Sequence, residues 1–539
     1  MLISETDDIQ YAGKSLIERV TGKFYTPDFL GCKLANSIVD ELDNQPQRLS
    51  YTICDPFGGD GRLITALLNK LSERGYEVSQ FQILVKDLDQ EPLNLASQSI
   101  LATAETLGLN VSVETEVGDS FYSEESKLYD VVVTNPPWEL LKPDRREMAH
   151  LSDSEVIAYK GWLKDRCVKL HELYPEAKGL RHWGGWGTNL ARCGWALSIR
   201  NCKPSGVLGI VLPGTIFADQ TSQPVRQKAF EKGQLCSVAT FPAEARLFER
   251  VDQPVVLATF RMNKEPSLKA DMQVFNRDKS VASCHKFNSG SEEHKARGYT
   301  IPVTFGFNSG DILPLFDGLP TFKSLEGEGR QQLWAGRELD ETRVAQKLCE
   351  SGTNLFVKGR HITRHTSSKD TEFSVIPEFV PEKPSIKCHR VVWRDVARSS
   401  QARRMIVGMI PPNWVAGNSL HVAFFRDDDV FRLKALYAIL SSYVFEFQVR
   451  TRLSTGHMSL GVVRDGRLPN LTPSLVDKLA AVTSKVILDK TQHAKYEVTV
   501  AKSYGLSREI FSEIIDAFPK LDPDERNALL NPKLWATKL

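Results

Sequence analysis

The chain has 539 residues, which is too long for one ordinary hydrophobic core and predicts two or three domains. Hydrophobic residues make up 41% and charged residues 25%, as in globular proteins, and no apolar run reaches the roughly eighteen residues of a membrane span. The acidic N-terminus lacks a secretory signal pattern, and the nine cysteines include no CxxC pair. We therefore expect a cytoplasmic protein without a disulfide framework, a zinc site or another metal, and without a membrane partner.

Charge is unevenly distributed along the chain. Residues 1–140 hold 10 Lys and Arg against 23 Asp and Glu, whereas residues 355–455 hold 16 against 9. The basic segment favours a partner of negative charge, with a solvated surface as the alternative.

The first 265 residues predict strands that alternate with amphipathic helices. Short apolar runs predict strands at 51–55, 81–87, 129–135, 206–213 and 255–260, and helices are predicted at 62–75 and 92–108. Continuous apolar strands separated by such helices predict an α/β fold with a mostly parallel sheet and helices on both faces. Ligands of these sheets bind at the carboxyl ends of the strands.

A glycine-rich turn follows the first of these strands. In DPFGGDG, residues 55–61, the glycines allow a ligand to approach the backbone closely, although a tight strand-to-helix connection without a ligand explains the turn as well. Asp87 ends the next strand, where a carboxylate can accept hydrogen bonds from both hydroxyls of a ribose; a loop acid or helix cap is the alternative. Asp119, in the loop before the strand at 129–135, is a candidate acceptor for an amine of the cofactor's base. Together these features favour a cofactor that contains a nucleoside.

The sequence NPPW, residues 135–138, ends the third strand abruptly. Two successive prolines, Pro136 and Pro137, remove two backbone donors and fix two φ angles, so this corner is stiff. The Asn135 side-chain oxygen and the Pro136 carbonyl can accept both hydrogens of an exocyclic amine and localise its lone pair, and Trp138 offers a face on which a planar base can stack. Hydride transfer has no use for these groups, so the corner favours S-adenosylmethionine over a nicotinamide dinucleotide.

After residue 265 the regular alternation ends. Residues 283–298 predict a loop or linker, residues 300–470 contain short strand-like runs broken by Gly and Pro, and the chain becomes helical from about 474. Within the basic segment, residues 356–365 and 387–404 interleave basic with aromatic residues, a pattern suited to contacts with nucleic-acid phosphates and bases.

In these motifs and their order, the sequence resembles the gamma-class (Taq-type) adenine-specific DNA methyltransferases over most of its length. GKFYTP at 22–27, DPFGGDG, KDLD at 86–89 and VGDSF at 117–121 resemble the cofactor motifs, and NPPW resembles the catalytic tetrad. GVLGIVLPGTIFAD at 206–219 and ARLFERVDQPVVLATF at 245–260 resemble later motifs of the catalytic domain. Asp60 stands where the family usually has Ser or Thr, and Asp87 where it more often has Glu.

The resemblance implies a Rossmann-like, S-adenosylmethionine-dependent catalytic domain at 1–265, a mixed α+β target-recognition domain with its linker at 266–473, and a helical C-terminal region at 474–539. It implies methylation of adenine N6 in a specific double-stranded DNA sequence by base flipping, in a restriction-modification system. The implied catalytic residues are Asn135, Pro136, Pro137, Trp138 and Phe248, of which Phe248 packs on the flipped base opposite Trp138 or against its edge. Without the resemblance of its motif, we would expect Phe248 to be an ordinary aromatic residue of the core. The implied cofactor residues are Tyr25, Thr26, Asp55, Phe57, Gly59, Gly61, Asp87, Asp119 and Phe121.

The basic segment becomes the expected DNA-binding region under this interpretation. Its candidate contacts are Lys358, Arg360, Arg390, Arg394 and Arg398, of which we expect fewer than half to touch DNA. No PD pair precedes a plausible (D/E)xK strand, so we expect a protein that modifies DNA without cutting it, with a separately encoded restriction endonuclease as a candidate partner. We also expect a monomer.

Three alternatives stay open. NPPW-type tetrads also occur in methyltransferases that act on RNA or on protein glutamine, which rarely carry some 240 further residues with a basic stretch. A non-catalytic DNA-binding subunit of a restriction complex would not need the intact tetrad and acid series. A type I methylase subunit is a weaker match, since about 20 residues precede the first motif here and a long helical region precedes it there.

Overall fold

The computed structural model describes residues 10–11, 14–15, 25–123, 127–143, 148–149, 151–178, 187–248, 253–263, 269–287, 289–301, 312–340, 345–367, 371–397, 401–453, 457–518 and 520–537. The chain forms two compact units, Met1–Phe305 and Gly306–Leu539, and each is described by itself.

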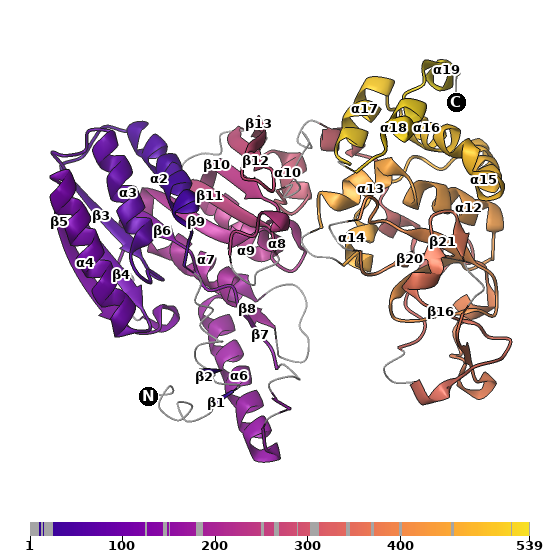
Figure 1. Ribbon diagram of the computed structural model, residues 1–539, viewed down its shortest axis with the longest axis horizontal. Coiled ribbons are helices and arrows are strands. Elements are labelled where there is room, and N and C mark those ends of the chain that lie inside the picture. Colours follow the sequence, from indigo (N-terminus) through magenta and orange to yellow (C-terminus); the bar gives the residue numbers. More distant parts are fainter. Residues whose placement is uncertain are drawn as a thin grey trace. The chain divides into compact units, whose positions relative to one another are not determined.

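A nine-stranded sheet forms the centre of the first unit (Figure 1). Its strand order is β13-β12-β10-β11-β9-β6-β3-β4-β5, and β11 and β13 run antiparallel to their neighbours. The strands of the unit are β1 Gln10–Tyr11, β2 Lys14–Ser15, β3 Ser50–Asp55, β4 Gln80–Asp87, β5 Asn110–Val117, β6 Tyr129–Thr134, β7 Leu140–Leu141, β8 Thr188–Asn189, β9 Cys202–Pro213, β10 Gly233–Phe241, β11 Val255–Met262, β12 Ala270–Phe275 and β13 Val281–Phe287.

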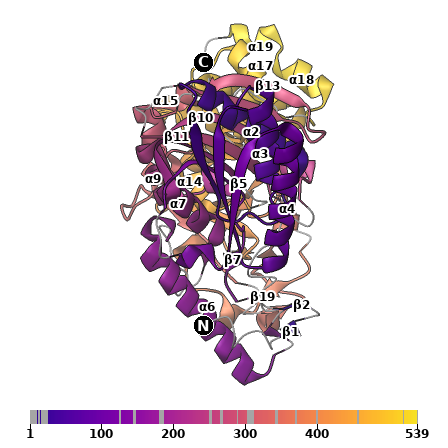
Figure 2. The same ribbon diagram turned by 90° about the vertical axis from the view of Figure 1, so that its left-hand side faces the viewer.

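Helices cover both faces of this sheet. The helices of the unit are α2 Asp28–Asp43, α3 Arg62–Glu73, α4 Gln90–Leu107, α6 Asp153–Leu173, α7 Leu190–Asn201, α8 Thr215–Ala218, α9 Gln223–Lys232 and α10 Glu292–Ala296. Helices α2, α3 and α4 pack side by side on one face, and α7 and α9 lie on the other (Figure 2). The central strands β6 and β9 are therefore buried on both sides, which explains their uninterrupted apolar runs. The predicted α/β fold is confirmed.

The position of the domain boundary differs from the sequence expectation. Strands β12 and β13 extend the sheet beyond β10, and α10 follows them, so the first unit continues past 265 to residue 305. Residues 283–298, expected as a loop or linker, include most of β13 and all of α10. The polar composition of β13 did not predict a strand, because β13 is the edge strand of the sheet and several of its side chains are exposed.

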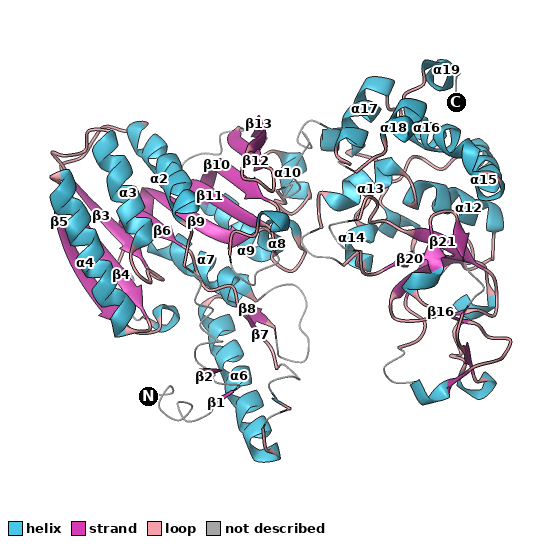
Figure 3. Ribbon diagram, in the orientation of Figure 1, coloured by secondary structure: helices cyan, strands magenta, loops and turns pink. Residues whose placement is uncertain are grey.

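The second unit combines a small antiparallel sheet, in the order β14-β23-β20-β21, with helices gathered at one end (Figure 3). Its strands are β14 Leu333–Gly336, β15 Leu348–Cys349, β16 Phe356–Val357, β17 Ile362–Thr363, β18 Thr366–Ser367, β19 Ser374–Val375, β20 Arg390–Arg394, β21 Val407–Ile410, β22 Val415–Ala416 and β23 Leu420–Phe425. Its helices are α12 Val430–Leu440, α13 Tyr443–Arg450, α14 Leu460–Arg464, α15 Pro473–Leu488, α16 His493–Ser503, α17 Arg508–Asp516, α18 Pro523–Leu529 and α19 Pro532–Ala536.

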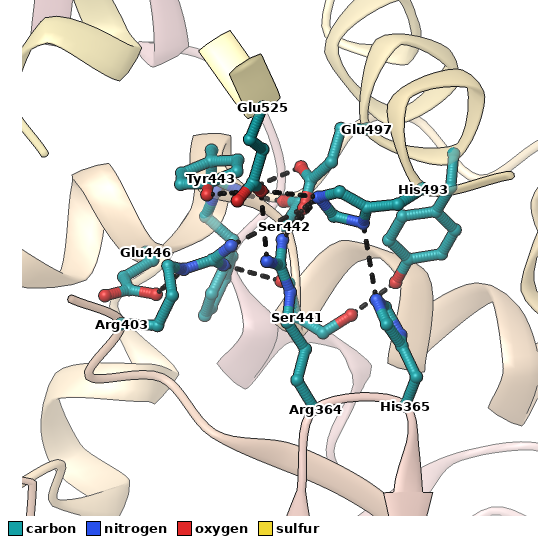
Figure 4. A network of polar contacts seen from close by, with 12 residues as sticks. Arg364, His365, Arg403, Ser441, Ser442, Tyr443, Glu446, His493, Glu497 and Glu525 are labelled. Carbon is teal, nitrogen blue, oxygen red and sulfur yellow. Dashed lines mark hydrogen bonds and ion pairs between the residues drawn. The ribbon is translucent and has the colours of Figure 1, made fainter. Parts of the chain in front are cut away.

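The helices after residue 473 belong to this unit and do not form a separate region. Arg364, at the turn of the β17–β18 hairpin, pairs with Glu497 of α16 at 2.9 Å and with Glu525 of α18 at 3.2 Å (Figure 4). Arg403 donates to Glu446 of α13 at 2.6 Å and lies 3.6 Å from Glu497. Because Glu446 and Glu497 are fully buried, each depends on these arginines for compensation. The network thus ties the C-terminal helices to the hairpin.

Among the described residues, no helix is both long and apolar enough to cross a membrane. In the same part of the chain, no group of three or more His, Cys, Asp or Glu side chains is arranged to hold a metal ion.

Candidate active site

A pocket of the first unit brings together most of the predicted site residues at the carboxyl ends of β3, β4 and β6. The cofactor candidates Tyr25, Phe57, Gly59, Asp87, Asp119 and Phe121 line it together with Asn135, Pro136, Pro137 and Trp138. Strands β3 and β6 are neighbours in the sheet, so the glycine turn after one and the NPPW corner after the other emerge side by side. The sequence predicts that these two motifs lie together, because each follows the carboxyl end of a predicted parallel strand.

The glycines of the turn have different tasks. A Cβ at Gly58 would lie 2.2 Å from Val85 Cγ1, and one at Gly61, whose φ is +79°, would lie 2.9 Å from Ala96 Cα. These two glycines therefore allow close packing, and Gly61, predicted to bind cofactor, lies behind the pocket wall. Gly59 does line the pocket, where its Cβ position would be 3.4 Å from the Tyr25 ring.

Two acids hold fixed positions in the pocket wall. The Asp87 carboxylate accepts from the amide of Gly59 at 3.1 Å and from that of Asp89 at 3.1 Å. Asp119 accepts from the Phe121 amide at 3.1 Å and forms an ion pair with Arg166 of α6 at 3.0 Å. Arg166 also lines the pocket. Sequence reasoning missed it because it lies in a helix 28 residues after Trp138, with no motif around it.

Asp55 lies buried at the base of the site, directly before the pocket residues Pro56 and Phe57. Its Oδ1 accepts from the Thr134 hydroxyl at 2.6 Å and from the Phe57 amide at 3.1 Å, so it links the two loops. Its Oδ2 is buried and has no hydrogen-bond partner among the described residues. Burial raises the pKa of Asp55 to about 7, against the effect of the two hydrogen bonds.

The NPPW corner is held rigidly from two sides. The Asn135 Nδ2 donates to the Thr26 hydroxyl at 3.1 Å, so the amide nitrogen is anchored outside the reacting position. Pro136 is buried against α7, where a Cβ on Gly194 would lie 2.3 Å from the Pro136 Cβ. Thr26, predicted to bind cofactor, is itself buried and does not line the pocket.

Trp138 and Phe248 contact each other directly. Their ring centroids are 5.0 Å apart with an interplanar angle of 67°, an edge-to-face arrangement, and both rings are nearly buried. A base between two rings needs about 7 Å, from two van der Waals layers of roughly 3.5 Å each. The arrangement therefore does not enclose a space for a base between the two rings, and contact of a base with both requires the rings to separate.

The predicted DNA contacts of the second unit have different surroundings. Arg390 is fully buried, pairs with the buried Glu338 at 3.3 Å and also donates to the Pro411 carbonyl, so its prediction as a DNA contact is wrong. Arg394 is partly buried and donates to the Ile362 carbonyl at 2.6 Å. Arg360 is exposed and Lys358 partly exposed, whereas Arg398 lies outside the described residues.

Comparison with known families agrees with this geometry. Residues 11–158, which contain the glycine turn, Asp87, Asp119 and the NPPW corner, match the family described as N-6 DNA Methylase. This part of the chain is therefore similar to the N-6 DNA methylases. The methylase subunit of the type I restriction enzyme MjaIX from Methanocaldococcus jannaschii is 23% identical over 268 residues, which are 48% of this chain and 40% of that protein. The match therefore spans less than half of the length of that relative.

Solved structures share the fold over much more of the chain. The type IIL restriction-modification enzyme MmeI in complex with DNA aligns with a TM-score of 0.56, 11% identity and coverage of 96% of this chain and 79% of that one. A nuclease-deletion mutant of the type ISP restriction-modification enzyme LlaGI in complex with a DNA substrate mimic aligns with a TM-score of 0.53 and 11% identity, over 86% of this chain and 47% of that one. At this identity the likeness shows a common fold.

Proposed function

We propose that this protein transfers a methyl group from S-adenosylmethionine to the N6 amine of adenine in a specific sequence of double-stranded DNA. The observation that carries the proposal is that the Asn135 corner and the Asp87 carboxylate line the same pocket of a methylase domain. The Asn135 corner suits the amine that accepts the methyl group, and the Asp87 carboxylate suits a ribose.

The pocket residues fit S-adenosylmethionine, which supplies an electrophilic methyl group on a sulfonium. Asp87 would accept from its ribose hydroxyls, and Asp119 from the amine of its adenine. Phe57 and Phe121, whose ring centroids are 5.0 Å apart, offer apolar surface for that base. The buried Oδ2 of Asp55, without a hydrogen-bond partner among the described residues, favours a cation nearby.

Asn135 and Pro136 would act on the adenine amine that accepts the methyl group. The amine of adenine is a poor nucleophile because its lone pair is delocalised into the ring. The Asn135 Oδ1 and the Pro136 carbonyl would accept its two N–H groups, which favours a pyramidal nitrogen and orients its lone pair. Fixed dipoles act best when they need not reorganise, and the prolines and the contact with Gly194 keep this corner rigid.

The second unit would select the DNA sequence. Its basic segment at 355–455 has a net excess of Lys and Arg, and MmeI, which shares the fold over 96% of this chain, was solved with DNA bound. Lys358, Arg360 and Arg394 remain candidate contacts, as does Arg398. We further propose a cytoplasmic monomer that protects DNA against a separately encoded restriction endonuclease.

Transfer of a labelled methyl group tests the proposal against its alternatives. Purified protein is incubated with S-[methyl-³H]adenosylmethionine and equal amounts of DNA, RNA or protein, and the modified base is identified after hydrolysis. We expect label in DNA as N6-methyladenine. Label only in RNA or in protein glutamine would reassign the substrate, and failure to bind S-adenosylmethionine would favour a non-catalytic DNA-binding subunit.

A further inference from the structure

We propose that Arg166 of α6 is a positioning residue that determines which base of the cofactor the pocket accepts, because it presents Asp119 as a fixed, charged hydrogen-bond acceptor. The inference rests on the proposed function, since it concerns the recognition of S-adenosylmethionine. It assigns a task to a basic side chain that belongs to none of the sequence motifs and yet lines the pocket.

The charged side chains of the pocket are two acids and one base. Of the described residues that line it, Asp87 and Asp119 are acidic and Arg166 alone is basic. Arg166 Nη2 lies 3.0 Å from Asp119 Oδ2, and the two side chains are only 13% and 11% exposed. A guanidinium can only donate and a carboxylate can only accept, so this contact has one direction. Because the pair is largely shielded from water, salt screens it less than a surface ion pair.

The Asp119 carboxylate keeps lone pairs for a ligand. An ionised carboxylate offers about four acceptor positions. The Arg166 guanidinium engages Oδ2, and the Phe121 amide donates to Oδ1 at 3.1 Å. The remaining positions can accept an N–H of the cofactor's adenine, but they repel a carbonyl oxygen. We therefore expect the pocket to accept a purine with an amine and to reject one with a carbonyl in its place.

Packing alone does not explain an arginine at this position. The guanidinium carbon of Arg166 lies 5.7 Å from the centroid of the Trp162 ring and 5.9 Å from that of the Tyr122 ring. Its Nε is buried and has no hydrogen-bond partner among the described residues. A buried donor without an acceptor costs free energy, and an apolar side chain would contact both rings without that cost. What arginine adds is the ion pair with Asp119.

Helix α6 holds Arg166 from a fixed support. The Cys167 thiol donates to the Leu141 carbonyl of β7 at 3.7 Å. The His171 ring and the Thr188 hydroxyl of β8 form a hydrogen bond of 2.8 Å. Cys167 and His171 follow Arg166 by one and five positions, and β7 and β8 pair with each other. The guanidinium therefore meets Asp119 from a helix that is fastened to the ribbon after the NPPW corner.

Binding of cofactor analogues tests the inference without turnover. S-adenosylhomocysteine carries the adenine amine, S-inosylhomocysteine carries a carbonyl in its place, and 5′-methylthioadenosine keeps the adenine but has no carboxylate. Their Kd values would be measured by calorimetry, with the thermal midpoint, for the full-length wild type, Arg166→Met, Arg166→Lys and Asp119→Asn. Lys164→Met is the matched control, because Lys164 is exposed on the same helix, does not line the pocket and loses the same charge.

We expect the wild type to bind S-adenosylhomocysteine roughly 100-fold or more tightly than S-inosylhomocysteine. Arg166→Met should lower this ratio roughly tenfold, because the carboxylate is then free to turn or to take up a proton and donate to the carbonyl. Asp119→Asn should lower it further, since an amide can donate as well as accept, and Arg166→Lys should fall between the wild type and Arg166→Met. Arg166→Met should weaken 5′-methylthioadenosine and S-adenosylhomocysteine by the same factor, and Lys164→Met should behave as wild type.

An unchanged ratio in Arg166→Met and Arg166→Lys would overturn the proposal even if both compounds bound more weakly, because Arg166 would then only support the pocket. Weaker S-adenosylhomocysteine with unchanged 5′-methylthioadenosine would also overturn it and would place Arg166 at the carboxylate of the cofactor. A wild type that binds neither adenine compound would overturn the proposed cofactor and the inference together. Since no methyl acceptor is present, a failure of DNA as the substrate leaves these ratios unaffected.

Discussion

Trp138, which lines the candidate active site, lies edge to face with Phe248, with ring centroids 5.0 Å apart. A flipped adenine would need a stacking surface there. We expect Trp138→Ala to slow methylation, because stacking on a base contributes roughly 1–3 kcal/mol and extrusion of the base costs a few kcal/mol. A mismatched target adenine should recover part of the rate, since it is extruded more easily. Trp138→Phe, which keeps an aromatic face, is the matched control.

Fluorescence of 2-aminopurine at the target position checks the same prediction directly. The signal should rise when the wild type binds and the base unstacks, and it should change in Trp138→Ala and in Phe248→Ala. If Trp138→Ala alters neither the rate nor the fluorescence, the ring only packs against Phe248.

Asp87→Ala should weaken the binding of S-adenosylmethionine, because two ribose hydroxyls lose a charged acceptor. Each hydrogen bond to a charged group contributes roughly 1.5–3 kcal/mol, so the Kd should rise about tenfold or more. Asp89, which does not line the pocket, provides the control Asp89→Ala. Calorimetry that finds equal affinities for wild type and Asp87→Ala would assign Asp87 to support of the Gly59 turn alone.

Asp55 should make the stability of the cofactor-free protein depend on pH. Its pKa is raised from 3.8 to about 7 by burial, so between these values the folded state binds a proton that the unfolded state has released. The free energy of unfolding therefore falls as the pH rises through this window. The difference in thermal midpoint between wild type and Asp55→Asn should shift in favour of the variant from pH 5 to pH 8. A constant difference would show that Asp55 has the same pKa in both states.

The amino-acid sequence predicted the candidate active site better than the surroundings of the basic residues in the second unit, for a physical reason. Strands buried on both faces are continuous apolar runs, so the ends that carry Asp55, Asp87 and Asn135 are visible in the sequence. In β20, RVVWR, basic residues flank an apolar core, and nothing local shows that Arg390 is buried against Glu338 while Arg394 is partly exposed.

Contacts between segments that are far apart in the chain could not be predicted from the sequence either. Thr26 stays a predicted cofactor residue from its motif, and the motif does not show that its hydroxyl accepts from Asn135 Nδ2, 109 residues away. Arg166 has no motif, and only the fold brings it to Asp119. Such pairings depend on tertiary structure and not on local periodicity.

Glu497→Ala should destabilise the second unit by about 1–3 kcal/mol, because it removes a buried acceptor of Arg364 and of the Tyr443 amide, while the pairs Arg364–Glu525 and Arg403–Glu446 remain. Glu513→Ala, at an exposed position of the neighbouring helix α17, should change stability by no more than about 0.5 kcal/mol. Urea unfolding followed by tryptophan fluorescence gives both values. Equal effects of the two substitutions would mean that the C-terminal helices do not depend on the network.

Long-read sequencing of DNA from cells that express the wild type or Asn135→Ala tests the central claim most directly, because it reports the modified base and its sequence context together. The account predicts N6-methyladenine at one recurrent sequence with the wild type and none with Asn135→Ala, although purified Asn135→Ala should still bind S-adenosylmethionine. Unmodified adenine in cells that express the wild type, or the same methylation with Asn135→Ala, would contradict it.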